Sequence, residues 1–518
     1  MIMRKIAIIF SAILLFGLQS CTDFLDIRPE NQVVLEDYWQ SESQATAVLS
    51  TCYVALNNTV DQMFIWGELR SDNVVEGNST NLDMLKILSV SITPTNGYAN
   101  WGSFYTIINY CNTFLYYAPN VVNKDQTFTP GKLHTLEAEA LTIRSLCYFY
   151  LLRTFKEVPL VLNPSISDQQ NYYVAKSTER VIIDQIISDL LKAQQTVRTD
   201  YGKGAYNKGR VTLNTVNTLL ADVYLWDQQY ANCVDACNKV LADKTLSLVS
   251  GDKMLTDVFY TGNSTESIFE LQFDKDIQYN YMPNFFFGYD GNHAGQLSFP
   301  KFLTRSGDYS PFNYKGVPVV ESDKDIRENS FYATTTNGTG YSILKYATIQ
   351  VVENPDGLTY TPKYRSGATT VNWILYRLSD VMLMKAEALV QLDRSNDDLK
   401  DAMKMLNTTY LRSNSTADSL QFNNYNDKGN MEKLVLRERQ RELMFEGKRW
   451  FDLMRLARRK NDPTAMLAFI SPKLSGDAMS KNKMSVMDAL YMPVLKSELD
   501  INPFLTQNPF YTDENLSK

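Results

Sequence analysis

The sequence predicts a mainly α-helical protein with a loop-rich, partly β insertion. Apolar residues recur every three or four positions in block after block, which is the pattern of helices that bury one face. Between about 246 and 373 this rhythm stops, and Gly, Asn, Pro and aromatic residues take its place. The predicted helices lie near 40–57, 102–118, 133–155, 178–197, 213–227, 230–243, 374–392, 397–412 and 431–459.

The first 20 residues have the pattern of a signal peptide. Arg4 and Lys5 precede an apolar stretch over 6–18, which is shorter than the roughly 20 residues that a bilayer-spanning helix needs. The sequence Leu-Gln-Ser before Cys21 resembles a lipobox, in which the cysteine thiol is acylated; the alternative is an ordinary buried cysteine. No later segment is apolar enough to span a membrane, so we expect attachment to a membrane by lipid alone.

The helix predicted over 133–155 carries the widest apolar stripe and needs neighbouring helices to cover it. The blocks at 213–227 and 230–243 match a tetratricopeptide helix pair, and the blocks at 374–412 match it less closely. Cys233 and Cys237 then lie at packing positions, which explains their spacing better than a metal site does. Only short strand-like runs, such as 267–273, occur within the insertion.

Composition excludes several functions. The 51 basic and 58 acidic residues give a net charge of -7, and no basic run is long enough to bind nucleic acid. The two histidines, His134 and His293, are too few for a multi-histidine metal site, so we predict no metal ligands and no cofactor. Structural calcium stays open, because Asp and Asn are plentiful in the loops although no EF-hand spacing is present. The 31 Tyr, 25 Phe and 6 Trp favour the binding of flat or amphipathic ligands.

Four segments, in order along the chain, resemble the SusD/RagB family of outer-membrane nutrient-binding lipoproteins. One difference is Lys156, where the family often has Gly. The segments are CTDFLDIRP at 21–29, EALTIRSLCYFYLLRTFKEVPLV at 139–161, LYRLSDVMLMKAEAL at 375–389 and RERQRELMFEGKRWFDLMR at 437–455.

The resemblance implies one SusD-like domain over 21–518. Its helical scaffold would cover about 38–245 and 374–460, with a loop-rich elaboration at about 246–373 and a C-terminal segment at 461–518. Such proteins capture glycan oligosaccharides at the cell surface and deliver them to a SusC-like TonB-dependent transporter without breaking a bond. Peptide capture, as in the RagB branch, a surface glycoside hydrolase and a pure protein scaffold are the alternatives.

The fourth segment also offers carboxylates that a hydrolase could use, Glu442 and Glu446. With Arg449 and Asp452 they are spaced three or four residues apart, so we expect these four side chains to pair with one another along one helix face. A glycosidase would instead hold two carboxylates on either side of a sugar. The sequence favours a structural ion-pair network here and no catalytic residue.

Ligand contacts are expected where aromatic rings stand beside amides, carboxylates or guanidinium groups, outside regular helices. Two early segments, 64–73 and 95–101, have this composition, and the family resemblance points to the same two segments. Trp101 could instead pack in the core and Asp72 could cap a helix, and the three phenylalanines at 285–287 are expected to be buried or at a protein interface. The candidates are Trp66, Arg70, Asp72, Asn96, Tyr98, Asn100, Trp101, Tyr281 and Tyr289.

Overall fold

The computed structural model describes residues 38–167, 169–286, 295–304, 308, 311, 325–335, 340–353, 360–365, 369–474 and 476–512. The predicted signal peptide, Cys21, Tyr289 and His293 lie outside these ranges, so the predictions for them stay predictions. Within the described part of the chain, no helix combines the length and the apolar character that crossing a membrane requires.

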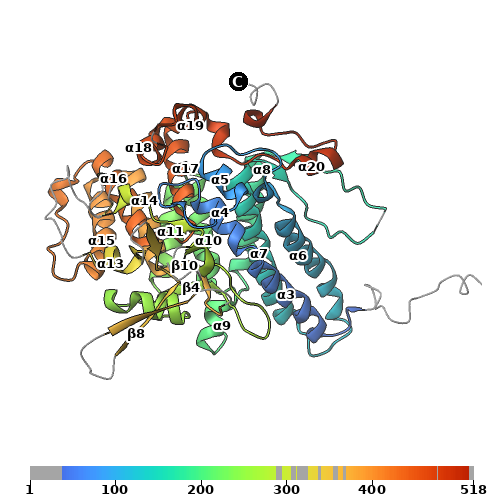
Figure 1. Ribbon diagram of the computed structural model, residues 1–518. Coiled ribbons are helices and arrows are strands. Elements are labelled where there is room, and N and C mark those ends of the chain that lie inside the picture. The colour runs from blue at the N-terminus through green and yellow to red at the C-terminus, as the bar shows by residue number, and fades with distance from the viewer. Residues whose placement is uncertain are drawn as a thin grey trace, which may run out of the picture.

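Ten helices of twelve residues or more form the scaffold of the described chain (Figure 1). Seven follow the predicted blocks closely, α14 covers most of the block at 374–392, and the block at 431–459 is divided between the last two. Sequential helices pack as neighbours, including α10 against α11 and α14 against α15, as tetratricopeptide-like pairs require. The ten are α3 (Glu42–Asn57), α6 (Gly102–Val121), α7 (Pro130–Phe155), α8 (Glu179–Gln194), α10 (Leu213–Trp226), α11 (Tyr230–Leu241), α14 (Leu378–Leu392), α15 (Asn396–Ser413), α16 (Lys428–Leu443) and α17 (Arg449–Lys460).

Two predicted helices differ from the structure. The block at 374–392 begins as a strand, β10 (Trp373–Arg377), which pairs antiparallel with β4 (Ser267–Leu271) and becomes helical only at Leu378. Every residue of both strands is buried, so the alternating pattern that marks a half-buried strand is absent. The block at 431–459 is two helices, because Phe445 and Gly447 adopt φ +67° and +71° and interrupt the run.

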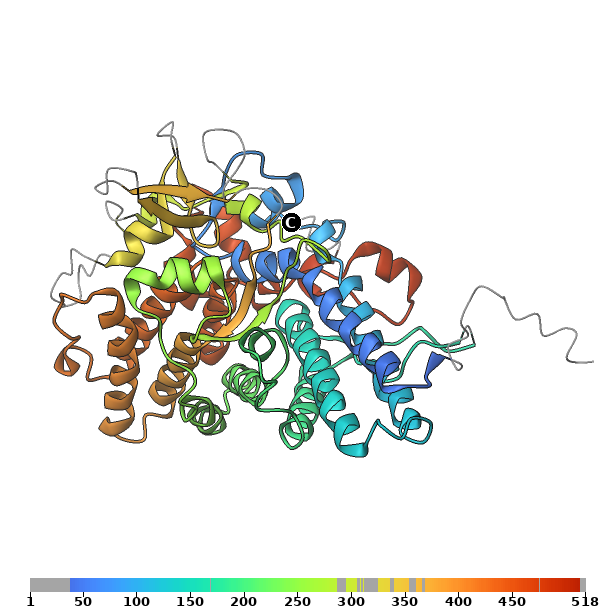
Figure 2. The ribbon, with the colours of Figure 1, turned by 90° about the horizontal axis from the view of Figure 1, so that it is seen from below.

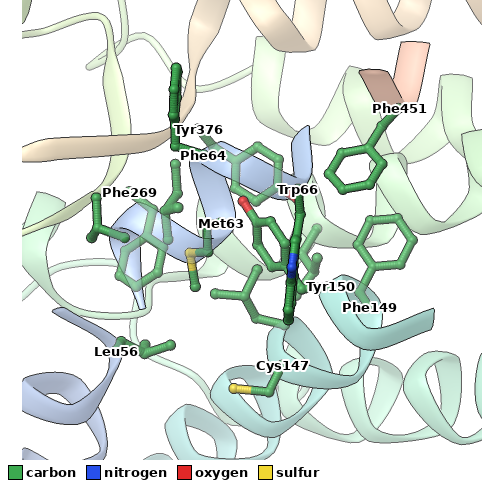
Figure 3. Packing of buried hydrophobic residues seen from close by; sticks show 14 of the residues in the cluster. Leu56, Met63, Phe64, Trp66, Cys147, Phe149, Tyr150, Phe269, Tyr376 and Phe451 are labelled. Atoms are coloured by element: carbon green, nitrogen blue, oxygen red, sulfur yellow. The ribbon is translucent and has the colours of Figure 1, made fainter. Parts of the chain in front are cut away.

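A helix that the sequence pattern did not indicate, α4 (Val60–Glu68), runs through the centre of the core. Figure 3 shows its Phe64 and Trp66 among side chains from α7 and α17. Gly67 of α4 approaches Gly447 so closely that a Cβ atom would stand 1.8 Å from the Gly447 carbonyl oxygen. Almost every residue of α4 is buried, so the helix has no polar face and no amphipathic signature.

The remaining elements are short. Most of the strands form two-stranded ribbons in and around the loop-rich region, whose predicted partly β character is confirmed. The strands are β1 (Val75–Glu76), β2 (Val158–Pro159), β3 (Lys176–Ser177), β5 (Leu297–Ser298), β6 (Tyr332–Thr334), β7 (Tyr341–Ile343), β8 (Thr348–Glu353) and β9 (Tyr360–Tyr364). The short helices are α5 (Leu82–Leu88), α9 (Gly204–Gly209), α12 (Pro283–Phe286), α13 (Ile326–Phe331), α18 (Leu467–Ile470), α19 (Ala478–Lys483) and α20 (Lys496–Ile501), with a π-helix at Met254–Thr261 and 3-10 turns at Gly97–Ala99, Gly251–Lys253, Lys301–Leu303, Phe422–Asn424, Pro463–Met466, Met487–Leu490 and Pro509–Tyr511.

The turn after α7 contains the one local departure from the family pattern. Lys156 adopts φ +70° and ψ -58°, and the Glu157 N–H donates to the Phe155 carbonyl oxygen at 2.9 Å, which makes a strained γ-turn. The Lys156 ammonium group pairs with Asp488 at 3.2 Å. Lysine therefore occupies a conformation that glycine adopts more readily, and its side chain recovers part of the strain.

Candidate ligand-binding face

The structure places both predicted tryptophans in the interior. Trp66 is 1% exposed, its ring stacks on Phe104 at 4.8 Å, and its indole N–H donates to the Tyr98 carbonyl oxygen at 2.8 Å. Trp101 is 3% exposed and packs edge-on against Phe155. Neither ring faces solvent, so we do not retain either as a ligand contact.

Arg70 and Asp72 are also interior groups. The Arg70 guanidinium group lies over the Trp450 ring and donates to the Leu490 carbonyl oxygen at 2.7 Å. Asp72 accepts two hydrogen bonds from Arg449, at 2.8 and 3.0 Å. Asp72 thus joins the segment after α4 to the first turn of α17, and this buried ion pair corrects its assignment as a ligand contact or a helix cap.

Asn96 is buried at the turn before α6 and caps it. Its side-chain oxygen accepts from the Tyr98 N–H at 3.0 Å, and its amide donates to the Asp83 carbonyl oxygen at 3.0 Å. All of its contacts shape the backbone that presents Tyr98. Asn96 is therefore a positioning residue in this structure and not a surface contact.

Tyr98, Asn100 and Tyr281 remain at the surface. Tyr98 is half-buried, and its hydroxyl accepts from the Asn81 amide at 3.0 Å. Burial and the nearby carboxylates of Asp61 and Asp83 raise the pKa of Tyr98, so its phenol stays protonated and able to donate. Asn100 is exposed, and its side-chain oxygen accepts from the Gly102 N–H at 2.7 Å.

The start of α4 links the loop that carries Tyr98 to the segment that carries Tyr281. The Gln62 side chain donates to the Asn100 carbonyl oxygen, and Asn58 accepts from the Gln278 amide at 2.6 Å. Tyr281 is 58% exposed.

The backbone beneath Tyr281 is fixed by its buried neighbour. The Asn280 N–H donates to the Thr369 carbonyl oxygen at 2.7 Å, and the Asn280 side-chain amide donates to Val371 at 2.8 Å. Nearby, β1 pairs with β5, which brings Val75–Glu76 beside Leu297–Ser298; the short strands lie near the top of the view in Figure 2. The exposed ring is therefore carried on a preformed turn.

We call the resulting surface the candidate face and define it by six residues. Sequence reasoning missed Asp61 and Asn81, because the α4 helix and the cap of α5 that present them have no distinct sequence pattern, and it preferred Tyr281 and Tyr289 to Tyr279. The face offers tyrosine rings, amide groups and a carboxylate, which suits hydrogen bonding to hydroxyl groups and packing on C–H surfaces. Its residues are Asp61, Asn81, Tyr98, Asn100, Tyr279 and Tyr281.

The carboxylates of the fourth segment are buried away from solvent and do not pair with one another. Glu442 contacts Arg377 at 2.6 Å, Arg327 at 3.1 Å and Arg412. Glu446 contacts Lys345 at 2.6 Å and Arg377 at 2.7 Å. The expected network exists, but its partners come from distant parts of the chain, because the predicted single helix is broken at Gly447.

Of the two other members of the predicted network, only Arg449 takes its partner from a distant part of the chain. Arg449 binds Asp72, while Asp452 accepts from Arg439 at 2.9 Å and from Arg455 at 2.7 Å. Burial alone would raise the pKa of Glu442, yet the surrounding guanidinium groups hold that pKa well below its usual value. A glycosidase needs one protonated carboxyl group, and Glu442 is ionised and covered by cations.

Metal-binding groups do not gather in the described chain: no three His, Cys, Asp or Glu residues there are close enough to hold an ion. Cys233 and Cys237 are buried free thiols on α11, and burial raises the pKa of Cys233 well above its usual value. The position of both side chains in the packed interior confirms the packing interpretation of their spacing.

Comparisons with known proteins agree with the fold. Residues 280–511 match a family model described as the SusD family, and residues 23–225 match one described as "Starch-binding associating with outer membrane". "SusD-like protein P38" of Formosa agariphila is 25% identical over 500 residues, covering 87% of this chain and 91% of the relative. "SusD-like protein P25" of the same organism is 23% identical and covers 97% and 98%.

Solved structures show the same architecture. A SusD superfamily protein from Bacteroides vulgatus aligns with a TM-score of 0.72 at 21% identity, covering 91% of this chain and 99% of that one. The protein named B. fragilis NanU aligns with a TM-score of 0.65 at 20% identity, covering 94% and 100%. These likenesses show the fold.

Proposed function

Because this chain belongs to the SusD/RagB family, we propose that it is a lipid-anchored outer-membrane protein that captures glycan oligosaccharides and delivers them to a SusC-like TonB-dependent transporter. The support is the match of residues 23–225 to the starch-binding, outer-membrane-associated family model. The segment that this model matches contains Tyr98 and Asn100, which lie on the candidate face.

The single observation that carries the glycan assignment is the make-up of the candidate face. Tyr98 and Tyr281 present their rings on turns held by buried asparagines, and Asn81 and Asn100 stand beside Tyr98. Two or three such rings support binding in the millimolar to micromolar range, or about -4 to -8 kcal/mol. Weak and reversible binding of this kind suits a protein that passes its ligand on.

Affinity gel electrophoresis tests this proposal directly. Neutral polysaccharides cast in a native gel should retard the wild-type protein, and they should retard the double variant Tyr98→Ala/Tyr281→Ala much less. Tyr116→Ala is the matched control, because Tyr116 is 55% exposed on α6 and outside the candidate face. Retardation of the double variant equal to that of wild type would place the site elsewhere. Binding of peptides in a parallel assay, without retardation by any polysaccharide, would favour the peptide-capturing alternative.

Lipid attachment at Cys21 needs its own experiment, since it rests on the lipobox resemblance. Cells that express the full chain are labelled with an alkyne analogue of palmitate. Wild type should carry the label in the outer-membrane fraction, and Cys21→Ser should lose both the label and the membrane association. A labelled Cys21→Ser protein would contradict this site of acylation. Co-purification with a barrel partner from the same cells tests delivery.

A further inference from the structure

A cavity lies between α6 and residues 160–165 and 170–174, outside the candidate face. Its volume is about 400 Å³, within the usual range of small-molecule sites. None of the described residues that line it has a charged side chain. Its polar groups are amides and hydroxyls, and its apolar walls include Leu160, Leu162 and Val174.

Several amide donors in this cavity have no partner among the described residues. The Asn109 side-chain oxygen accepts from the Ser165 N–H at 2.7 Å, which leaves its amide N–H groups unused by described neighbours. Asn171 is similar: its oxygen accepts from the Tyr173 N–H at 3.0 Å. The Tyr172 ring, 52% exposed, stands at the cavity edge. The site therefore combines free amide donors with one accessible ring.

The frame behind these groups is rigid and electrically neutral. Asn112 donates to the Val161 carbonyl oxygen at 3.0 Å and accepts from Arg144 at 2.7 Å. Arg144 in turn pairs with Asp189 through two hydrogen bonds, so its charge is compensated beneath the cavity floor. Such a preformed cavity loses little conformational entropy when a ligand binds.

The loop itself is held along its length. Gln170 accepts from the Ile166 N–H at 2.7 Å and donates to the Pro164 carbonyl oxygen at 2.9 Å. At the far end, Asn502 donates to the Val174 carbonyl oxygen at 3.0 Å. The lining groups are therefore presented by a loop whose backbone is fixed at three places.

From this juxtaposition of uncharged amides, an accessible tyrosine ring and aliphatic walls, we propose that the cavity between α6 and residues 160–165 and 170–174 is a second binding site, for one unit of a neutral sugar. An acidic sugar finds no cation among the described lining residues, whereas hydroxyl groups find donors and acceptors and a sugar C–H face finds the ring. The ligand class rests on the proposed function, but the site has its own residues and its own test.

The experiment removes the first site and then perturbs the second. Ligand-observed saturation-transfer NMR is recorded with glucose, galactose, mannose, xylose and glucuronic acid on the Tyr98→Ala/Tyr281→Ala protein. At least one neutral sugar should still give a signal, and glucuronic acid should give a weaker one. Adding Tyr172→Ala should weaken binding roughly tenfold. Adding Asn109→Asp instead, which keeps the acceptor for Ser165 and removes the donor, should also weaken it.

Both perturbed groups are at least partly exposed, so the variants should fold, and unchanged thermal midpoints check this. The second site is overturned if the Tyr98→Ala/Tyr281→Ala protein binds no neutral sugar, if Tyr172→Ala and Asn109→Asp leave its signal unchanged, or if glucuronic acid binds as well as the neutral sugars. Failure of the proposed function looks different: the wild type and the Tyr98→Ala/Tyr281→Ala protein would then show equal retardation in polysaccharide gels.

Discussion

Glu442→Gln should destabilise the fold strongly while leaving the shape of the side chain almost unchanged. Glu442 has no exposed surface, and its two oxygens contact three guanidinium groups, those of Arg327, Arg377 and Arg412. Glu442 belongs to a cluster in which ion pairs of the described chain join five buried cations to five buried carboxylates, Glu442 included. These are Arg327, Lys345, Arg377, Arg412 and Arg441, and Glu266, Asp325, Glu438, Glu442 and Glu446.

The substitution removes one negative charge from a balanced cluster and leaves a buried positive charge uncompensated. Breaking a buried pair in this way costs about 3 to 5 kcal/mol. The unfolding entropy of globular proteins is roughly 2.1 cal/mol/K per residue, which for a chain of this size comes to about 1 kcal/mol/K. The thermal midpoint of Glu442→Gln should therefore fall by about 3 to 5 °C.

Differential scanning calorimetry measures this shift, with Lys496→Gln as the control. Lys496 pairs with Asp500 at 3.0 Å, but both side chains are mostly exposed, so this loss should stay below about 0.5 kcal/mol. The control should melt within 1 °C of wild type. If Glu442→Gln does so as well, the claim that the cluster stabilises the fold is refuted. If it also abolishes a measurable glycan hydrolysis, the carboxylate is catalytic.

Three further predictions concern the backbone, the pH and the thiols. Lys156→Gly should raise stability by about 1 kcal/mol in denaturant titrations, because relief of the γ-turn strain exceeds the loss of an exposed ion pair; a destabilised variant would show that the turn is unstrained. Burial raises the pKa of Glu68 from 4.5 to about 7, so the wild type loses stability as pH rises across that window. Relative to the wild type, Glu68→Gln should therefore become more stable by up to about 3 kcal/mol as the pH rises, and parallel stability profiles of the two proteins would contradict this. The five described cysteines, including Cys233 and Cys237, should react with a thiol reagent only after denaturation, and rapid modification in the native state would count against their packing role.

Helices such as α8 and α11 could be predicted from sequence because each buries one face. Their buried residues recur at helical spacing, as Ile182, Ile186 and Ala193 do in α8 and Cys233, Cys237 and Val240 do in α11. The central helix α4 could not, because it has only nine residues and seven of them are buried, which leaves no apolar stripe against a polar face. The strand β10 was hidden for the same reason, since it is buried on both faces.

The candidate site was harder to predict, because a polar residue beside an aromatic one looks the same in a buried cluster and at a surface. Asp72 pairs with Arg449, which lies 377 residues later in the chain, and local spacing carries no information about that contact. Likewise Glu442 and Glu446 are neutralised by cations from other segments and not by their neighbours in sequence. Tyr98, Asn100 and Tyr281 stay at the surface because the buried side chains of Asn96 and Asn280 hydrogen-bond to the backbone near them and hold their turns in place.

The most direct measurement combines binding with a check on the bound molecule. Purified protein is titrated calorimetrically with an oligosaccharide fragment of the neutral polysaccharide that best retards it in gels. The ligand is then recovered, and its mass is measured by mass spectrometry. The proposal predicts saturable micromolar-to-millimolar binding that Tyr98→Ala/Tyr281→Ala strongly weakens, with every ligand molecule returned at its original mass. Shortened ligand, or undiminished binding by that variant, would contradict it.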